Sequence, residues 1–310
     1  MNRNRPVLGT IILLISAFIW GTSFVAQRMA TNYMDSVAYN SIRLAIGSVF
    51  LFIVILITDF IKKKAHKEVQ NWNLETLFAG LILGVCIFFA TTIQQVGLET
   101  TAAGKSGFIT ALYIAFVPII GLLCKKKTPL VGWFAIPIAL LGFAMMSIHE
   151  DFTIELGDTL TLLCAIIFAQ QILLLDTFNK VDPIKITFME FFVAAIIGLI
   201  WMGSAGSTPT PTQMINCIWP ILYVGILSSG VAYLGQTIGQ RMVNPALATL
   251  LMSLEAVFAL IAGGILLHET HSAQEAIGVV IVFIAVMIAE QTPYKKFLSN
   301  NLKIRNGQVV

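Results

Sequence analysis

Residues 51–57 read Leu51-Phe52-Ile53-Val54-Ile55-Leu56-Ile57, and residues 11–15 read Ile11-Ile12-Leu13-Leu14-Ile15. These two uninterrupted apolar runs decide the fold class. A strand of a membrane barrel alternates apolar and polar side chains over about ten residues, and neither run alternates. The runs therefore predict helices that lie in a bilayer.

The composition extends this prediction to the whole chain. Of its 310 residues, 57% are hydrophobic and 11% are charged, and the mean hydropathy is +0.86, whereas soluble domains carry about 25% charged residues. The charges gather in short breaks between apolar runs of about 17–25 residues, the length that crosses the hydrocarbon core as a helix. We predict an all-α integral membrane protein with about ten transmembrane helices. The predicted spans are 7–27, 37–57, 77–97, 105–124, 129–148, 157–176, 186–203, 219–239, 247–267 and 275–290.

The basic residues predict the orientation. Of the 19 lysines and arginines, all except Arg28, Arg43 and Lys105 fall on one side of the predicted spans. Cytoplasmic loops hold the excess of basic residues, so we expect a multi-pass protein of the cell membrane with both termini in the cytoplasm. Such an arrangement requires an even number of spans. Because these basic residues flank membrane helices, we expect no nucleic-acid partner.

An internal repeat divides the predicted spans into two groups of five. An offset of 148 residues takes Gly9 to Gly157, and an offset of 145 takes Gln95 to Gln240. Because five is odd, the second group enters the membrane from the opposite side, which is the inverted-repeat architecture of many secondary transporters. The predicted units are residues 1–150, residues 151–291 and a cytoplasmic tail at 292–310.

Two stretches carry a resemblance to a known family. Ala17-Phe18-Ile19-Trp20-Gly21-Thr22-Ser23-Phe24 resembles the first-helix motif of the EamA-type drug/metabolite transporter superfamily. Leu254-Glu255-Ala256-Val257-Phe258-Ala259, followed by Leu266-Leu267-His268-Glu269, resembles its ninth-helix pattern, with Ala256 in place of the usual proline and His268 in place of the usual glycine. The resemblance implies ten spans in paired five-helix repeats. It also implies alternating-access movement of small metabolites, amino-acid-like or drug-like, with export as the expected direction.

Polar residues inside the spans are candidates for substrate binding, because a polar group in hydrocarbon costs free energy unless it faces a cavity or a partner. On the eighth span, Tyr233, Gln236 and Gln240 share one helical face. The 145-residue offset relates this face to Phe88, Thr91 and Gln95 on the third span. We interpret both stripes as the lining of one substrate cavity. Packing between helices through buried amides is the alternative.

Three further stretches add candidates to this cavity. Trp20, Ser23 and Gln27 share a face of the first span, and Gln171 is the counterpart of Ser23 in the sixth. Tyr113 shares a face of the fourth span with Thr110, where packing alone is an equal alternative. The expected partners are a small-molecule substrate and the lipid bilayer, and a homodimer is compatible with the sequence.

Three charged residues within the spans are candidates for coupling or charge pairing. Arg43 lies about six residues from the outer end of the second span, so its side chain could instead reach that interface. Glu190 is its counterpart in the repeat, and an Arg43–Glu190 pair would lower the cost of both charges. Glu255 lies near the middle of the ninth span, where it could hold a proton, bind an amine or pair with Arg43 or Lys105.

Other functions are weaker readings of the sequence. An intramembrane enzyme needs a nucleophile with a base or a metal cluster at membrane depth, and a channel needs no pair of alternating halves. We expect no enzyme activity and no cofactor, and the chain has no GxxxxGK[ST] loop for ATP. We also expect no metal site, because the polar residues of the outer loops lack the His-Glu-x-x-His spacing. These residues are His149, Glu150, Asp151, His268, Glu269 and His271.

Overall fold

The computed structural model describes residues 6–124, 130–147, 155–243, 245–267, 272–274 and 276–288. Within these ranges every regular element is a helix, so the prediction of an all-helical membrane protein is confirmed. Eight helical segments are long and apolar enough to cross a membrane, and two shorter apolar helices cover Trp133–Met145 and Ala276–Ile288. The shorter pair lies inside the predicted spans 129–148 and 275–290, whose remaining residues include undescribed ones. The predicted tail and the histidines of the outer loops also fall outside the described residues.

The elements follow the predicted spans closely. In the first half they are α1 (Pro6–Ala30), α2 (Ser36–Lys64), α3 (Leu74–Gly97), α4 (Ala103–Ala111), α5 (Tyr113–Leu123) and α6 (Leu130–Ser147). In the second half they are α7 (Leu156–Thr177), α8 (Pro183–Ser204), α9 (Pro211–Asn216), α10 (Ile218–Leu222), the π-helix η1 (Tyr223–Ala232), α11 (Tyr233–Gly239), α12 (Pro245–Met252) and α13 (Glu255–Leu266).

Two aspartates set the starts of α2 and α8 in the same way. Asp35 Oδ1 accepts hydrogen bonds from two backbone N–H groups of the first turn of α2, both at 3.0 Å. Asp182 Oδ1 does the same for α8, at 2.9 and 3.2 Å. Such a cap is worth about 1 kcal/mol because it satisfies backbone donors that the helix leaves unpaired. α2 also runs seven residues past its predicted end, to Lys64, because lysines favour the negative end of a helix.

Three predicted spans are irregular at mid-length. The fourth is interrupted at Leu112, whose N–H donates to Ile109 O at 3.2 Å, and the ninth at Leu254, whose N–H donates to Leu251 O at 3.3 Å. These tight turns leave carbonyl groups of the preceding turn outside the regular helical ladder. The eighth span is π-helical over the ten residues of η1. Irregular turns inside helices often mark functional sites, and all three adjoin the cavity described below.

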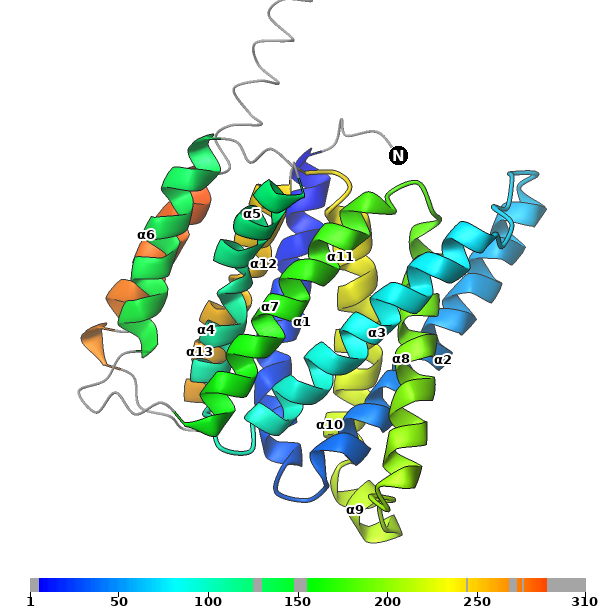
Figure 1. The fold of residues 1–310 in the computed structure, drawn as a ribbon, viewed down its shortest axis with the longest axis horizontal. Helices are drawn as coiled ribbons and strands as arrows, with labels where there is room; N and C mark the ends of the chain where they lie inside the picture. Colours follow the sequence, from blue (N-terminus) through cyan, green and yellow to red (C-terminus); the bar gives the residue numbers. More distant parts are fainter. Residues whose placement is uncertain are drawn as a thin grey trace, which may run out of the picture.

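The packing of the helices has a crossed pattern (Figure 1). α1 packs against η1, α11 and α13, whereas α7 packs against α3, α4 and α5. α2 and α8 pack against each other. α6 lies at the edge of the bundle beside the helix Ala276–Ile288, and Gly142 packs against Val282 there. The helices of each half therefore pack extensively on those of the other half.

Glycines allow the closest of these contacts. A Cβ atom on Gly80 would lie 2.3 Å from Met189 Cβ, and one on Gly84 would lie 2.6 Å from Val193 Cβ. Gly80 and Gly84 thus allow α3 to pack closely against α8. Such small residues let backbones approach in a membrane, where association depends on packing.

Candidate functional site

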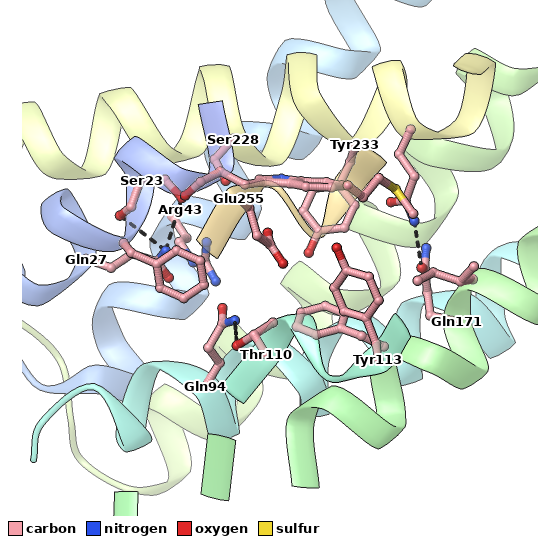
Figure 2. Close-up of a pocket in the computed structure, with 16 residues that line it drawn as sticks. Ser23, Gln27, Arg43, Gln94, Thr110, Tyr113, Gln171, Ser228, Tyr233 and Glu255 are labelled. Atoms are coloured by element: carbon pink, nitrogen blue, oxygen red, sulfur yellow. Dashed lines mark hydrogen bonds between the residues drawn. The ribbon is translucent and has the colours of Figure 1, made fainter. Parts of the chain in front are cut away.

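A polar cavity lies at the centre of the bundle, where the irregular spans meet (Figure 2). It is lined by residues of α1, α2, α3, α4, α5, α7, η1, α11, α12 and α13. The space within it that the centre of a water molecule can occupy is about 40 Å³. That space holds a few waters, since one needs about 10–15 Å³ on this measure. A metabolite would enter only after the helices move.

Most of the predicted site residues line this cavity. They are Trp20, Ser23, Gln27, Arg43, Tyr113, Gln171, Tyr233, Gln236 and Glu255. The structure thus brings together both halves of the chain, including the first-span stripe and most of the eighth-span stripe. Trp20 and Tyr233 pack edge to face with their ring centroids 4.9 Å apart, which gives the cavity an aromatic wall shared by α1 and α11.

The third-span stripe lies outside the cavity. Phe88 is fully buried and packs against Trp201 of α8, with centroids 5.7 Å apart. Thr91 Oγ1 accepts a hydrogen bond from Asn40 Nδ2 of α2 at 3.1 Å. This face of α3 is therefore turned toward α2 and α8. Helical periodicity predicts which residues share a face, but not which neighbour covers it.

The two predicted amides at the ends of the stripes hold backbone carbonyls instead of lining the cavity. Gln95 Nε2 donates to Gln27 O at 3.3 Å, and Gln240 Nε2 donates to Ile172 O at 2.7 Å. Both partners of the second bond lie 145 residues after those of the first. Each bond ties the third helix of a half to its first, so these glutamines do the same packing work in the two halves.

Several lining residues were not among the predicted site residues. Gln94, the neighbour of Gln95, faces the cavity and donates to Thr110 Oγ1 at 3.0 Å. A mid-span glutamine costs free energy without a partner, and that signal applied equally to both members of the pair. The other residues are Phe24, Phe168, Ile172, Ser228 and Met252.

Arg43 is buried and held by its own helix. Its side chain is 2% exposed, so it does not reach the outer interface. Its Nε donates to Asn40 Oδ1 at 2.7 Å, while Nη2 is buried without a partner. Among the described residues neither Glu190 nor Glu255 forms an ion pair with Arg43. Lys105 pairs with Asp158 at 2.7 Å.

Glu255 opens α13 and points into the middle of the cavity, toward Tyr113 and Tyr233 (Figure 2). Its side chain is 4% exposed, and Oε1 has no hydrogen-bond partner. The Tyr113 hydroxyl is buried beside the Glu255 carboxyl group but forms no hydrogen bond of normal geometry, and the buried Trp20 indole N–H has no partner. Buried polar groups are paired in nearly all native structures, so such a gathering around one cavity indicates a site that a ligand or water completes. No group of three metal-binding side chains occurs in the described part of the chain.

The fold and the cavity define a polytopic helical membrane protein with a polar site at its centre. The family model described as the EamA-like transporter family matches residues 7–148 and again residues 155–290. The chain belongs to this family, and it is a membrane transporter.

Several relatives match this chain in sequence over almost its whole length. An uncharacterized transporter of Archaeoglobus fulgidus is 27% identical, with 89% of this chain and 83% of that protein covered. The uncharacterized transporter YwfM of Bacillus subtilis is 24% identical over 93% of this chain and 95% of its own length. The uncharacterized inner membrane transporter YedA of Escherichia coli is 25% identical, covering 91% and 90%. One solved crystal structure matches the fold with a TM-score of 0.72 at 14% identity, over 91% of this chain and 98% of its own.

Proposed function

We propose that this protein is a secondary transporter that moves small amino-acid-like or drug-like solutes through the central cavity by alternating access. The observation that carries the proposal is the set of buried, unpartnered donors and acceptors that face one cavity between the two halves. Arg43 and Glu255 supply opposite charges, and Trp20 and Tyr233 supply aromatic faces. Such a lining suits a solute with an apolar body and polar or charged ends.

We further propose ten spans in two inverted five-helix repeats, over residues 1–150 and 151–291. The crossed packing supports this, because exchanging the two halves turns the contacts of α1 into those of α7. The equivalent hydrogen bonds that the side-chain amides of Gln95 and Gln240 form in the two halves support it as well. The double match to the family model supports it too. Substrate sites between inverted repeats lie near the membrane midplane.

The proposed orientation places both termini in the cytoplasm and the protein in the cell membrane. The basic residues support this orientation through their concentration on one side. The small volume of the cavity supports a transport cycle in which the helices move before a metabolite-sized solute fits. Outward movement is the direction that we propose from the resemblance to exporters.

The test uses the purified full-length protein in proteoliposomes. Radiolabelled amino acids and cationic aromatic drugs are offered with and without a proton gradient, and both uptake and counterflow are measured. Saturable counterflow of at least one solute, lost in Trp20→Ala with Tyr233→Ala, supports the proposal. A conductance that never saturates would indicate a pore, and the absence of flux for every solute would overturn the proposed substrate class.

A further inference from the structure

Glu190 lies behind the wall of the cavity and reaches it only through other side chains. It belongs to α8, is fully buried and does not line the cavity. Its Oε1 accepts a hydrogen bond from Gln171 Nε2 at 2.7 Å. Gln171 Oε1 in turn accepts one from Gln236 Nε2 at 3.2 Å. Glu190, Gln171 and Gln236 thus form one hydrogen-bonded row from α8 through α7 to α11.

The chemistry of amides gives this row a direction. A primary amide donates only from its nitrogen and accepts only at its oxygen. Because Gln171 uses its nitrogen toward Glu190, it presents its oxygen to Gln236. Gln236 must therefore donate to that oxygen from its Nε2. Its own Oε1 is then left buried without a partner. Because an ionised carboxylate can only accept, Glu190 in its ionised form sets the acceptor that Gln236 offers at the cavity wall, two side chains away.

No lysine or arginine among the described residues pairs with Glu190. Its Oε2 has no hydrogen-bond partner among them. Gln171 is thus the side chain through which Glu190 acts. A leucine would pack as well against α3 and α7 without the cost of burying a carboxyl group, so plain helix packing does not account for a glutamate here.

We propose that Glu190 is a positioning residue for substrate specificity, because it fixes Gln171 and Gln236 so that this end of the cavity accepts a hydrogen bond from the substrate. The inference rests on the proposed transport function and adds to it a required feature of the solute. Figure 2 places Arg43 and Gln171 at opposite ends of the cavity. Arg43 Nη2 is an unpartnered donor, so the solute carries an acceptor at the Arg43 end and an N–H or O–H donor at the Gln236 end.

The first test needs no substrate. In Glu190→Gln the new side-chain nitrogen can donate to Gln171 Oε1. The hydrogen bonds between residues 190, 171 and 236 are then no longer confined to one donor–acceptor order. Side-chain amide NMR signals of ¹⁵N-glutamine-labelled protein should then shift for both Gln171 and Gln236. The signal of Gln240, which donates to Ile172 O, should stay unchanged. A Gln236 signal that does not move would overturn the proposal.

The matched control removes a different hydrogen bond between the same helices. Thr187 Oγ1 and Thr237 Oγ1 join α8 to α11 at 2.8 Å, and neither residue lines the cavity. Thr187→Val should leave the amide signals of Gln171 and Gln236 in place. If Thr187→Val moved them as much as Glu190→Gln does, general loosening of the helix pair would explain the result and the proposal would fail.

The second test measures specificity with tyrosine and O-methyltyrosine, which share the carboxylate acceptor for Arg43 and the ring but differ in the O–H donor at the other end. Dissociation constants come from quenching of tryptophan fluorescence. We expect a preference for tyrosine that falls about threefold or more in Glu190→Gln, the value of one net hydrogen bond. The preference should persist in Thr187→Val.

A double substitution separates the row from an independent effect of Glu190. In Gln236→Met the preference is already lost, so adding Glu190→Gln should change it no further. Additive losses would contradict the row. Failure of the wild-type protein to bind or carry any solute would count against the transport function, whereas the amide signals of the empty protein decide the positioning role by themselves.

Discussion

Lys105 and Asp158 form an ion pair of 2.7 Å that joins the start of α4 to the first turn of α7. Asp158 also accepts hydrogen bonds from Thr101 Oγ1 and from the backbone N–H of Glu155, both at 3.0 Å. In the proposed orientation this cluster lies on the outer face. It holds segments from both halves together above the cavity.

Asp158→Asn should favour opening of the cavity toward the outside, because it removes the ion pair but keeps the size of the side chain. The lysine side chain is 32% exposed, so the pair is worth no more than about 1 kcal/mol. We expect the reaction of a cysteine at Ser23 with an external, membrane-impermeant thiol reagent to accelerate up to about fivefold.

An ion pair on the opposite face supplies the comparison. Lys62 and Asp182 lie 3.3 Å apart between α2 and the start of α8. Lys62→Met leaves the Asp182 cap intact and should slow the same external labelling. If both substitutions accelerated the reaction, the pairs would stabilise the fold in general and would not act as closures of opposite faces.

Gln94 and Gln95 offer a matched pair for mapping the cavity. Gln94 lines it, whereas Gln95 is fully buried against α1. In a chain freed of its native cysteines, Gln94→Cys should react with a small hydrophilic thiol reagent at least about tenfold faster than Gln95→Cys, since thiolates form and react where water reaches. Equal rates would mean that α3 can rotate or that water reaches both faces.

The helices could be predicted from the sequence because a segment that crosses a bilayer must be apolar and must pair its own backbone polar groups, which long apolar runs do as helices. Trp20, Tyr233 and Gln236 could be placed in one cavity because helical spacing fixes a shared face. Thr91 and Gln95 could not be assigned correctly, because their neighbours on α2 and α1 depend on how the helices pack.

Two further features of the site differ in how far the sequence reveals them. Asn40 stands three residues before Arg43, a spacing that brings side chains together on a helix, so this partner was predictable in principle. The interruptions at Leu112 and Leu254 were not, because no proline occupies either position. Their local turns depend on tertiary packing.

Gly84→Leu should destabilise the protein strongly. A Cβ at this position would lie 2.7 Å from Glu190 O and 2.6 Å from Val193 Cβ, and α3 and α8 would have to separate. Overpacking of this kind costs about 1–3 kcal/mol, which thermal unfolding of the detergent-solubilised protein would record. The control is Gly203→Leu on the outer part of α8, where nothing lies within 4 Å. Equal stability of the two variants would exclude a tight α3–α8 contact.

Reporter fusions test the proposed orientation. A phosphatase fused after Lys64, at the end of α2, should stay inactive, because the proposed orientation places that end in the cytoplasm. Fused after Ser207, between α8 and α9, it should be active. A fluorescent protein that matures only in the cytoplasm should give the reverse pattern at both sites. Active phosphatase at Lys64 would invert the orientation that the basic residues predict.

Glu255→Gln tests whether the central carboxyl group couples transport to protons. Glu255 lies between the two halves with an unpartnered oxygen and no ion pair among the described residues. In the proposed alternating-access cycle, its proton would be exchanged with each side in turn. Glutamine mimics a permanently protonated acid. We expect Glu255→Gln to lose accumulation driven by a pH gradient while it retains exchange of substrate for substrate.

Both activities are measured in the same vesicles, with the pH gradient imposed or collapsed, and Glu190→Gln serves as the second carboxyl variant. Because Glu190 does not line the cavity, its variant should keep gradient-driven accumulation and change only the choice of substrate. Loss of both activities in Glu255→Gln would indicate that Glu255 binds the substrate directly. Full retention of both would mean that the protein runs without a proton or uses another ion, because no other carboxyl group among the described residues faces the cavity.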